Sequence, residues 1–442
     1  MRHATGVQRF DALVLGGGPA GCVVGARLSE NGDRTVALVE AGPDYGPYVE
    51  GRWPPDLLDA RALALSHSWE TDREDRSQLR ARVLGGCSAH NACVVLRGAP
   101  ADYDEWGPGW TNAELEPYLE RAERELDVRR FTEAELSPWH RAFAQAEGAI
   151  VHPVNARGTV RWNAAFAYLD PARDRPNLTI LADTLVDRVE PGRRRVLTDR
   201  GPLEAETIVL CAGAYGSAGI LLRSDISPGS GLPAGENLID HAGVGLGWEP
   251  TEELQRETAP FAGERPVFMA QVTVAARSSA CPDELSDLFV FPALDPGYEI
   301  SAAVFAMKPY SRGSVRLNGR DPRTPLAIDH GWLRDPRDLD VIVEGVQATR
   351  ELAARESTRR YAARELRPGP SADLEAYVRE AVRGFFHPVG TCAIGSVVDA
   401  GGRVIGYDGL YVADASIMPT IPRANTHLST LAVAERIAEL LG

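Results

Sequence analysis

The 442-residue sequence predicts an α/β protein with a smaller second domain of the α+β class. Two observations predict this fold. Short runs of consecutive apolar residues, typical of parallel strands buried on both faces, occur near both ends and in the middle of the chain. Between them lie segments of alternating polarity, typical of a mostly antiparallel sheet, together with charged helices. The first domain is therefore expected to be discontinuous, comprising residues 1–112, 165–248 and 385–442, with 113–164 and 249–384 forming the second.

The elements of the first domain begin with a strand–turn–helix–strand unit of about thirty residues. Its strands are expected at Asp11–Leu15 and Thr35–Glu40, around a helix over Ala20–Ser29. The other elements of this domain share the same apolar character: strands at Glu206–Cys211 and Gly409–Ala413, and helices at Gly216–Leu222 and Asn425–Leu441.

The elements of the second domain differ in pattern. Ala113–Gly148 is charge-rich with a helical period, and Pro336–Ala354 predicts an amphipathic helix with Asp335 at its cap and proline at its first position. Alternating polarity predicts strands at Pro266–Ala276, Leu288–Pro292 and Ile300–Met307.

Composition excludes several classes of function. The chain has 47 basic and 62 acidic residues, a net charge of −15, which disfavours binding to nucleic acid. Its apolar runs are too short for an integral membrane segment, and the first eighteen residues lack a secretory pattern. The six cysteines show neither CxxC pairs nor metal-ligand spacing. We therefore expect a cytoplasmic protein with reduced thiols and no metal.

A glycine-rich turn follows the first strand. Gly16, Gly18 and Gly21 match G-x-G-x-x-G, with Pro19 and Ala20 opening the helix. Such glycines allow a tight turn, close approach of the backbone to a pyrophosphate, and helix–strand packing. Glu40 ends the second strand, where an acid binds ribose hydroxyls. The pattern predicts a Rossmann-type dinucleotide site but leaves FAD and NAD undivided.

Four further motifs distinguish these cofactors. They read RVLGGCSAHNACVVLRG (82–98), AGAYGSAGILL (212–222), LPAGENLIDH (232–241), and FHPVGT (386–391) followed by GYDGLYVADASIMPTIPRANTHLSTLAVAE (406–435). In this order they resemble the glucose–methanol–choline (GMC) family of FAD-dependent oxidoreductases. The resemblance implies FAD as cofactor and a Rossmann-type FAD-binding domain beside a smaller substrate domain.

The resemblance also implies the site residues. His387 matches the catalytic histidine, which takes the hydroxyl proton, and Asn425 matches the second catalytic position, which holds the substrate oxygen. Besides the glycine turn and Glu40, the implied FAD contacts are Ala41, Val83, Gly86, His90, Asn91, Ala92, Cys93, Val94, Val186, Ala212, Asp414, Ala415, Thr426, His427 and Leu428.

Three further histidines, His90, His241 and His427, lie in these motifs. The GGCSAHNAC segment is similar to that of choline-oxidising members of the family, which implies a covalent link between FAD and His90; the alternative is a buried histidine that only packs near the flavin. His427 is interpreted as a flavin contact through its backbone rather than as a catalytic group. Asp240–His241 is interpreted as structural.

The implied reaction oxidises the CH–OH group of an alcohol by hydride transfer to flavin N5, with oxygen or a redox cofactor or protein as electron acceptor. The alternative is a GMC-type lyase that uses FAD only structurally. A neutral alcohol is favoured over choline, because the expected pocket residues offer a cation no carboxylate. These residues are Phe268, Phe289, Phe291, Phe305, Met307, Phe385 and Phe386, with Glu264 and Asp287 the nearest acids in sequence.

Overall fold

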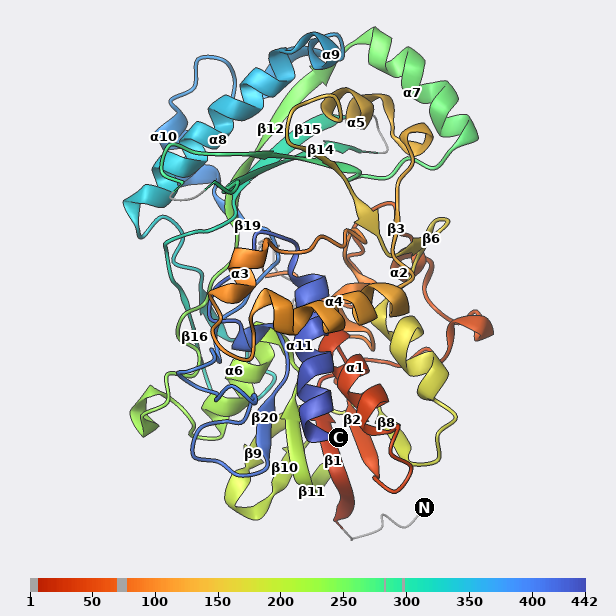
Figure 1. Cartoon of the computed structure of the whole chain (residues 1–442), viewed down its shortest axis with the longest axis vertical. Helices are drawn as coiled ribbons and strands as arrows, with labels where there is room; N and C mark the ends of the chain where they lie inside the picture. Colours follow the sequence, from red (N-terminus) through yellow and green to blue (C-terminus); the bar gives the residue numbers. More distant parts are fainter. Residues whose placement is uncertain (1–6, 70–77, 282–283, 296–298) are drawn as a thin grey trace.

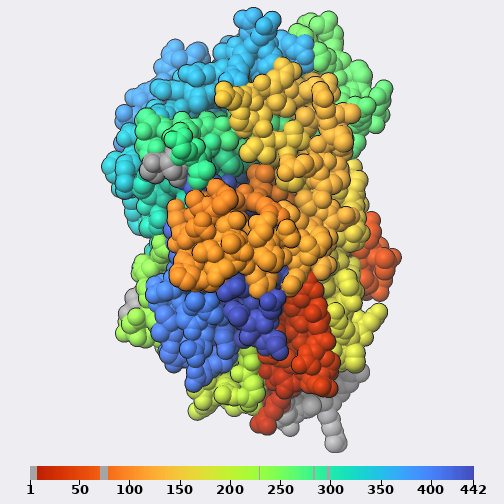
Figure 2. Space-filling view, in the orientation of Figure 1, coloured from red at the N-terminus to blue at the C-terminus, as the bar shows by residue number. Residues whose placement is uncertain are grey.

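The computed structural model describes residues 7–69, 78–281, 284–295 and 299–442. Residues 1–6, which belong to the opening segment that lacks a secretory pattern, lie outside the described residues. Two sheets, each covered by helices, are stacked along the long axis (Figure 1). In the space-filling view the orange part of the chain, which includes the helices α3 (Pro100–Asp104) and α4 (Asn112–Glu125), lies across the middle of this face (Figure 2).

The first sheet has the predicted Rossmann-type core of parallel strands. Its order is β8-β2-β1-β11-β10-β9, with β20 also paired to β11. The pairs β8–β2, β2–β1, β1–β11 and β11–β20 are parallel, whereas β9, β10 and β11 form an antiparallel meander. The strands are β1 (Gln8–Leu15), β2 (Val36–Val39), β8 (Leu178–Leu181), β9 (Val186–Glu190), β10 (Arg195–Thr198), β11 (Gly201–Leu210) and β20 (Leu410–Val412). Near the glycine turn the paired residues are apolar and buried, as burial on both faces requires: residues 12–15 of β1, Val36–Val39 of β2 and residues 208–210 of β11.

The second sheet is antiparallel, with the order β18-β12-β15-β14-β13-β4 and β19 paired to β12. Its strands are β4 (Ala149–Val151), β12 (Ala242–Pro250), β13 (Val272–Ala276), β14 (Leu288–Leu294), β15 (Ile300–Ala306), β18 (Ala362–Arg367) and β19 (Arg383–Gly384). One boundary expected from the sequence is wrong: residues 242–248, assigned to the first domain, belong to this sheet. The reason is that residues 242–248 of β12 pair with residues 300–306 of β15. This pairing joins residues more than fifty positions apart, so the local sequence pattern does not show it.

Helices cover both sheets. The predicted helix over Pro336–Ala354 is α8, and the Asp335 side chain accepts a hydrogen bond from the Arg337 backbone as its cap. The remaining helices and short strands are α1 (Pro19–Leu28), α2 (Pro55–Leu58), α5 (Pro138–Phe143), α6 (Gly213–Arg223), α7 (Glu252–Glu264), α9 (Glu356–Arg359), α10 (Leu374–Ala381), α11 (Thr426–Leu441), β3 (Arg129–Arg130), β5 (Pro153–Val154), β6 (Ala156–Arg157), β7 (Val160–Arg161), β16 (Ser314–Arg316) and β17 (Ala327–Asp329). In the described ranges no helix has both the length and the apolar character to cross a membrane.

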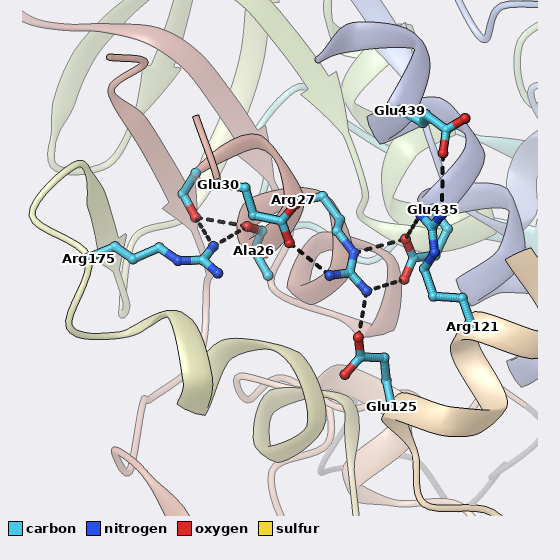
Figure 3. A network of polar contacts seen from close by, with 9 residues as sticks. Ala26, Arg27, Glu30, Arg121, Glu125, Arg175, Glu435 and Glu439 are labelled. Carbon is cyan, nitrogen blue, oxygen red and sulfur yellow. Dashed lines mark hydrogen bonds and ion pairs between the residues drawn. The ribbon is translucent and has the colours of Figure 1, made fainter. Parts of the chain in front are cut away.

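A partly buried ion-pair network, centred on the buried Glu435, joins α1, α4 and α11 (Figure 3). Arg27 donates from Nε and Nη2 to the two carboxylate oxygens of Glu435, each at 2.9 Å, and also reaches Glu125 at 2.7 Å. The Glu435 side chain is fully buried, and Arg121 of α4 reaches it at 3.3 Å. The network therefore fixes the helix that begins with the glycine turn against the helix that begins at Asn425.

Candidate active site

The glycine turn lies between β1 and α1 and has no room for a side chain at Gly16 or Gly21. Gly16 has a φ of +107°, and a Cβ at Gly21 would lie 1.8 Å from the Gly16 carbonyl oxygen. Gly18 is the N-cap of α1 and offers no side-chain cap, so the N–H groups of the first helical turn keep their capacity for an external acceptor. This is the arrangement that a pyrophosphate requires.

Glu40 lies beside this turn, as the sequence predicts. Its carboxylate accepts hydrogen bonds from the Gly17 backbone N–H at 2.8 Å and from the Gly42 backbone N–H at 2.7 Å. Burial raises the pKa of Glu40 to about 7, although these two hydrogen bonds favour its ionised form. The side chain is therefore fixed at the end of β2, where hydroxyl donors of a ribose can complete its bonding.

The 82–98 segment packs directly on the glycine turn. The Gly85 N–H donates to the Gly17 carbonyl at 2.8 Å, and a Cβ at Gly86 would lie 2.6 Å from the Gly18 Cα. The short helix Gly86–Ala89 then ends at His90, whose side chain is almost fully buried. Two motifs separated by about seventy residues thus form one surface.

His90 has an unusual environment. The Ser66 backbone lies near the ring, but neither ring nitrogen makes a hydrogen bond of ordinary geometry to the described residues. Burial lowers the pKa of His90 to about 4, so the imidazole is neutral at physiological pH and keeps a nitrogen lone pair. A buried imidazole without partners indicates a group that a ligand completes.

Asp414 joins two further motifs. Its carboxylate accepts from the Gly213 N–H at 2.8 Å, from the Ser217 hydroxyl at 2.5 Å and from the Ser416 N–H at 2.8 Å. These contacts hold the start of α6, with Ala212 as its N-cap, against the segment that follows β20. Burial raises the pKa of Asp414, and the hydrogen bonds oppose that shift.

The predicted catalytic pair meets, although the two residues are 38 positions apart. The Asn425 Nδ2 lies 3.2 Å from the His387 Nε2, and Asn425 is the N-cap of α11. The His387 backbone N–H donates to the Asp240 carboxylate at 3.0 Å, which fixes the loop after β19. Burial lowers the pKa of the His387 imidazole to about 3, so the residue is neutral and able to accept a proton.

The other expected contact residues divide into two groups. Thr426 and His427 occupy the first turn of α11, and burial lowers the pKa of His427 to about 4. Leu428 is fully enclosed in the hydrophobic core, so only its backbone is available to a ligand. The rest lie on the segments already described or at their borders: Ala41, Val83, Asn91, Ala92, Cys93, Val94, Val186 and Ala415.

The donor set fits a flavin dinucleotide. Beside the side-chain-free turn and Glu40, several buried polar atoms make no hydrogen bond to the described residues: the Asn425 Oδ1, the His427 Nε2, both nitrogens of His90 and the Asn163 Nδ2. Asn163 was not recognised from the sequence. Its Oδ1 accepts from the Ala165 and Phe166 N–H groups next to Gly85, which leaves its Nδ2 donor for a ligand.

An apolar wall stands next to His387. The Phe385 ring lies 4.5 Å from the His387 ring and stacks on Phe305 at 4.0 Å between centroids. Five of the expected pocket residues belong to this cluster: Phe289, Phe291, Phe305, Met307 and Phe385, together with Val94, Leu96 and Ala424. Phe386 is instead exposed, and Phe268 packs on Phe131 in the core of the second domain.

The acids near this wall in sequence lie outside the cluster. Asp287 is buried, with its carboxylate accepting from the Ser278 N–H at 2.8 Å and the Ser278 hydroxyl at 2.6 Å. Glu264 is exposed at the end of α7. Across the described ranges, no group of three or more His, Cys, Asp or Glu side chains is arranged to hold a metal ion.

Comparison with known proteins identifies the family to which the chain is similar. The family model described as GMC oxidoreductase matches residues 10–150, 137–243 and 309–434. The chain is 33% identical to 5-(hydroxymethyl)furfural oxidase of Methylovorus sp. (strain MP688), covering 98% of each protein, and 29% identical to choline oxidase of Arthrobacter globiformis, covering 98% of this chain and 94% of that one. The crystal structure of pyridoxine 4-oxidase from Mesorbium loti superposes with a TM-score of 0.83 at 27% identity, covering 98% of this chain and 99% of that chain.

Proposed function

This chain belongs to the GMC oxidoreductase family, and from that premise we propose which residues carry its reaction and which alcohols it accepts. It is an FAD-dependent oxidoreductase that acts on the CH–OH group of an alcohol. The observation that carries the proposal is the contact between the His387 Nε2 and the Asn425 Nδ2, 3.2 Å apart, at the start of α11, the helix that is fixed against α1.

His387 and Asn425 act on different atoms of the substrate hydroxyl group. When an alcohol hydroxyl replaces the Asn425–His387 hydrogen bond, the neutral His387 accepts the hydroxyl proton at Nε2. The Asn425 Nδ2 then donates its hydrogen bond to the alcohol oxygen while negative charge develops on it. Bound FAD supplies the two-electron acceptor for the hydride that leaves the carbinol carbon. The proton and the hydride together account for the two hydrogens lost when the alcohol becomes an aldehyde or ketone.

We infer that the preferred alcohol is neutral. The wall beside His387 consists of phenylalanine, methionine and aliphatic side chains, which favour hydrocarbon at about 25 cal/mol per Å² of buried apolar surface. A quaternary ammonium needs charge as well as aromatic faces when it leaves water. The two acids nearest to this wall in sequence offer no charge, since Asp287 is engaged by Ser278 and Glu264 lies on the surface.

The experiment is an anaerobic titration of the purified, FAD-loaded enzyme with a panel of benzylic, furanic and aliphatic alcohols and with choline. We expect neutral alcohols to bleach the visible absorbance of the flavin faster than choline at equal concentration. Faster bleaching by choline would contradict the assignment of the pocket, and turnover of a cyanohydrin without bleaching would identify a lyase instead.

Admitting air to the reduced enzyme tests the acceptor. The relatives named as oxidases support oxygen, so rapid return of the yellow colour with one hydrogen peroxide per flavin is expected. Slow return in air, with fast return on adding a quinone or dye, would identify a dehydrogenase.

A reducing compartment such as the cytoplasm is supported by the six cysteines, none of which forms a disulfide among the described residues.

We further propose that His90 is covalently joined to FAD. Such a link would join one imidazole nitrogen of His90 to the 8α carbon of bound FAD, with loss of two hydrogens that oxygen would take up as hydrogen peroxide. The neutral, unpartnered ring of His90 supports this role, because its lone pair is free to form the bond. After acid precipitation, the protein pellet of the wild type is expected to remain yellow.

The matched variants are His90→Ala and His427→Ala, since both side chains are imidazoles with an unpartnered buried nitrogen. His90→Ala should bind FAD but release all of it into the acid supernatant, because the glycine turn and Glu40 are unchanged. His427→Ala should keep a yellow pellet. A colourless wild-type pellet after full flavin loading would show that His90 only packs near the cofactor.

A further inference from the structure

His387 has a second histidine behind it. The Nδ1 atoms of His241 and His387 lie 2.9 Å apart, and the two rings meet edge to face with centroids 5.2 Å apart. The other nitrogen of His241, Nε2, lies 3.1 Å from the Pro422 carbonyl oxygen. His241 follows directly after Asp240 and is fully buried at the start of β12, so its ring has a fixed position.

These contacts determine where the protons are. A carbonyl oxygen only accepts, so the His241 Nε2 must carry a proton that it donates to Pro422. In a neutral imidazole the other nitrogen then has none, and the His241 Nδ1 is an acceptor. The His387 Nδ1 must therefore be the donor, which leaves the His387 Nε2 unprotonated and facing Asn425.

We propose that His241 is a positioning residue that holds His387 in the tautomer with its basic nitrogen, Nε2, toward the substrate. The inference rests on the proposed role of His387 as the base. His241 acts through His387 alone: it fixes the ring orientation before the reaction, and its Nδ1 accepts a stronger, charge-assisted hydrogen bond once His387 has taken the proton.

The surroundings of the pair are consistent with a neutral His241. Burial and the neighbouring His387 and Lys308 keep the pKa of His241 well below its usual range. Asp240 directs its carboxylate to the backbone N–H groups of Phe385 and His387 rather than to either ring. Two further neighbours of the His387 ring, the Phe385 side chain and the Asn425 amide, do not titrate.

Three substitutions separate tautomer control from a merely structural contact. His241→Phe keeps a ring but removes the acceptor. In His241→Asn the amide oxygen takes the place of Nδ1 and can accept from His387, whereas in His241→Gln the amide nitrogen takes the place of Nε2 and keeps only the bond to Pro422. The readout is the limiting rate of flavin reduction in the FAD-loaded enzymes, as a function of pH and of alcohol concentration.

We expect His241→Phe and His241→Gln to lower this rate by about 10- to 100-fold, part of the ~10²–10⁴-fold contribution of a positioned acid–base group. The alcohol dissociation constant should change little. The acidic limb of the pH profile should move to lower pH, because protonated His387 loses its acceptor and its pKa falls. His241→Asn should recover most of the rate. Equal or better recovery by His241→Gln would overturn the proposal, since it would show that the Pro422 contact is what matters.

The tautomer itself can be measured in the wild type, independently of activity. In FAD-loaded enzyme labelled with ¹⁵N-histidine, the His387 signals, assigned by their loss in His387→Asn, should show a protonated Nδ1 and an unprotonated Nε2. A protonated Nε2 would overturn the inference even if every variant folded poorly. If instead His387→Ala reduced its flavin at the wild-type rate while the expected tautomer was observed, the proposed function would fail and the positioning contact would stand.

Discussion

Replacement of His387 by alanine is expected to slow reduction of the flavin by an alcohol about 10²–10⁴-fold, the usual contribution of a positioned acid–base group. The reason is that Nε2 of His387 is the unprotonated nitrogen beside the Asn425 amide, while burial keeps the ring neutral. Stopped-flow absorbance under nitrogen measures the rate, and the flavin content of the variant should equal that of the wild type because the glycine turn is unchanged.

Asn425 and His427 provide the comparison. Asn425→Ala should cost up to about 10²–10³-fold, the loss of one hydrogen-bond donor to a developing oxyanion. His427→Ala should cost less, since Asn425 and not His427 makes the contact with His387. A larger loss in His427→Ala than in Asn425→Ala would show that the assignment of the two positions at the start of α11 is wrong.

Arg27→Met is expected to lower the free energy of unfolding by about 3–5 kcal/mol, the usual cost of removing one partner of a buried ion pair. The variant removes the guanidinium group that donates two hydrogen bonds to the fully buried Glu435 carboxylate. Arg121, at 3.3 Å, is then the remaining cation beside this carboxylate in the network (Figure 3). Urea denaturation followed by circular dichroism and by flavin fluorescence measures the change.

Arg320→Met is the matched control, because Arg320 and its partner Asp225 are both mostly exposed and such a solvated pair contributes little to stability. The double variant Arg27→Met with Glu435→Met should recover much of the loss, since an apolar pair of similar volume removes the unpaired buried charge. Equal stability of Arg27→Met and Arg320→Met would mean that the network does not hold α1 against α11.

Much of the fold could be predicted because its signals are local. The glycine turn, the apolar strands β1 and β2, and Glu40 lie within about thirty residues, and each is specified by backbone sterics or by burial over a few positions. The cap and first turn of α8 are likewise set by Asp335 and the proline after it. These features appear in the structure at the expected residues.

The catalytic pair and the cofactor segments were predicted by a different route, from motifs that resemble a family, and the structure brings His387 and Asn425 into contact. Asn163 was missed because nothing in its own sequence distinguishes it. Its role as a candidate donor depends on Gly85, about eighty residues earlier, which packs against it. The prediction that Phe386 lines the pocket was wrong. Its backbone adopts a φ of +61°, and its side chain is exposed instead of packing in the wall that contains Phe385.

The sequence by itself determined the nucleotide-binding turn, the class of the fold and the identity of the proposed base. Only the tertiary structure decided that residues 242–248 join the second sheet, and that His241 lies behind His387 with its Nε2 on Pro422. The physical reason is the range of the forces that specify each feature. Turns and strand patterns depend on neighbouring residues, whereas the proton position on His387 depends on a hydrogen bond to a residue 146 positions away, which β12 places there by pairing with β15 and β19.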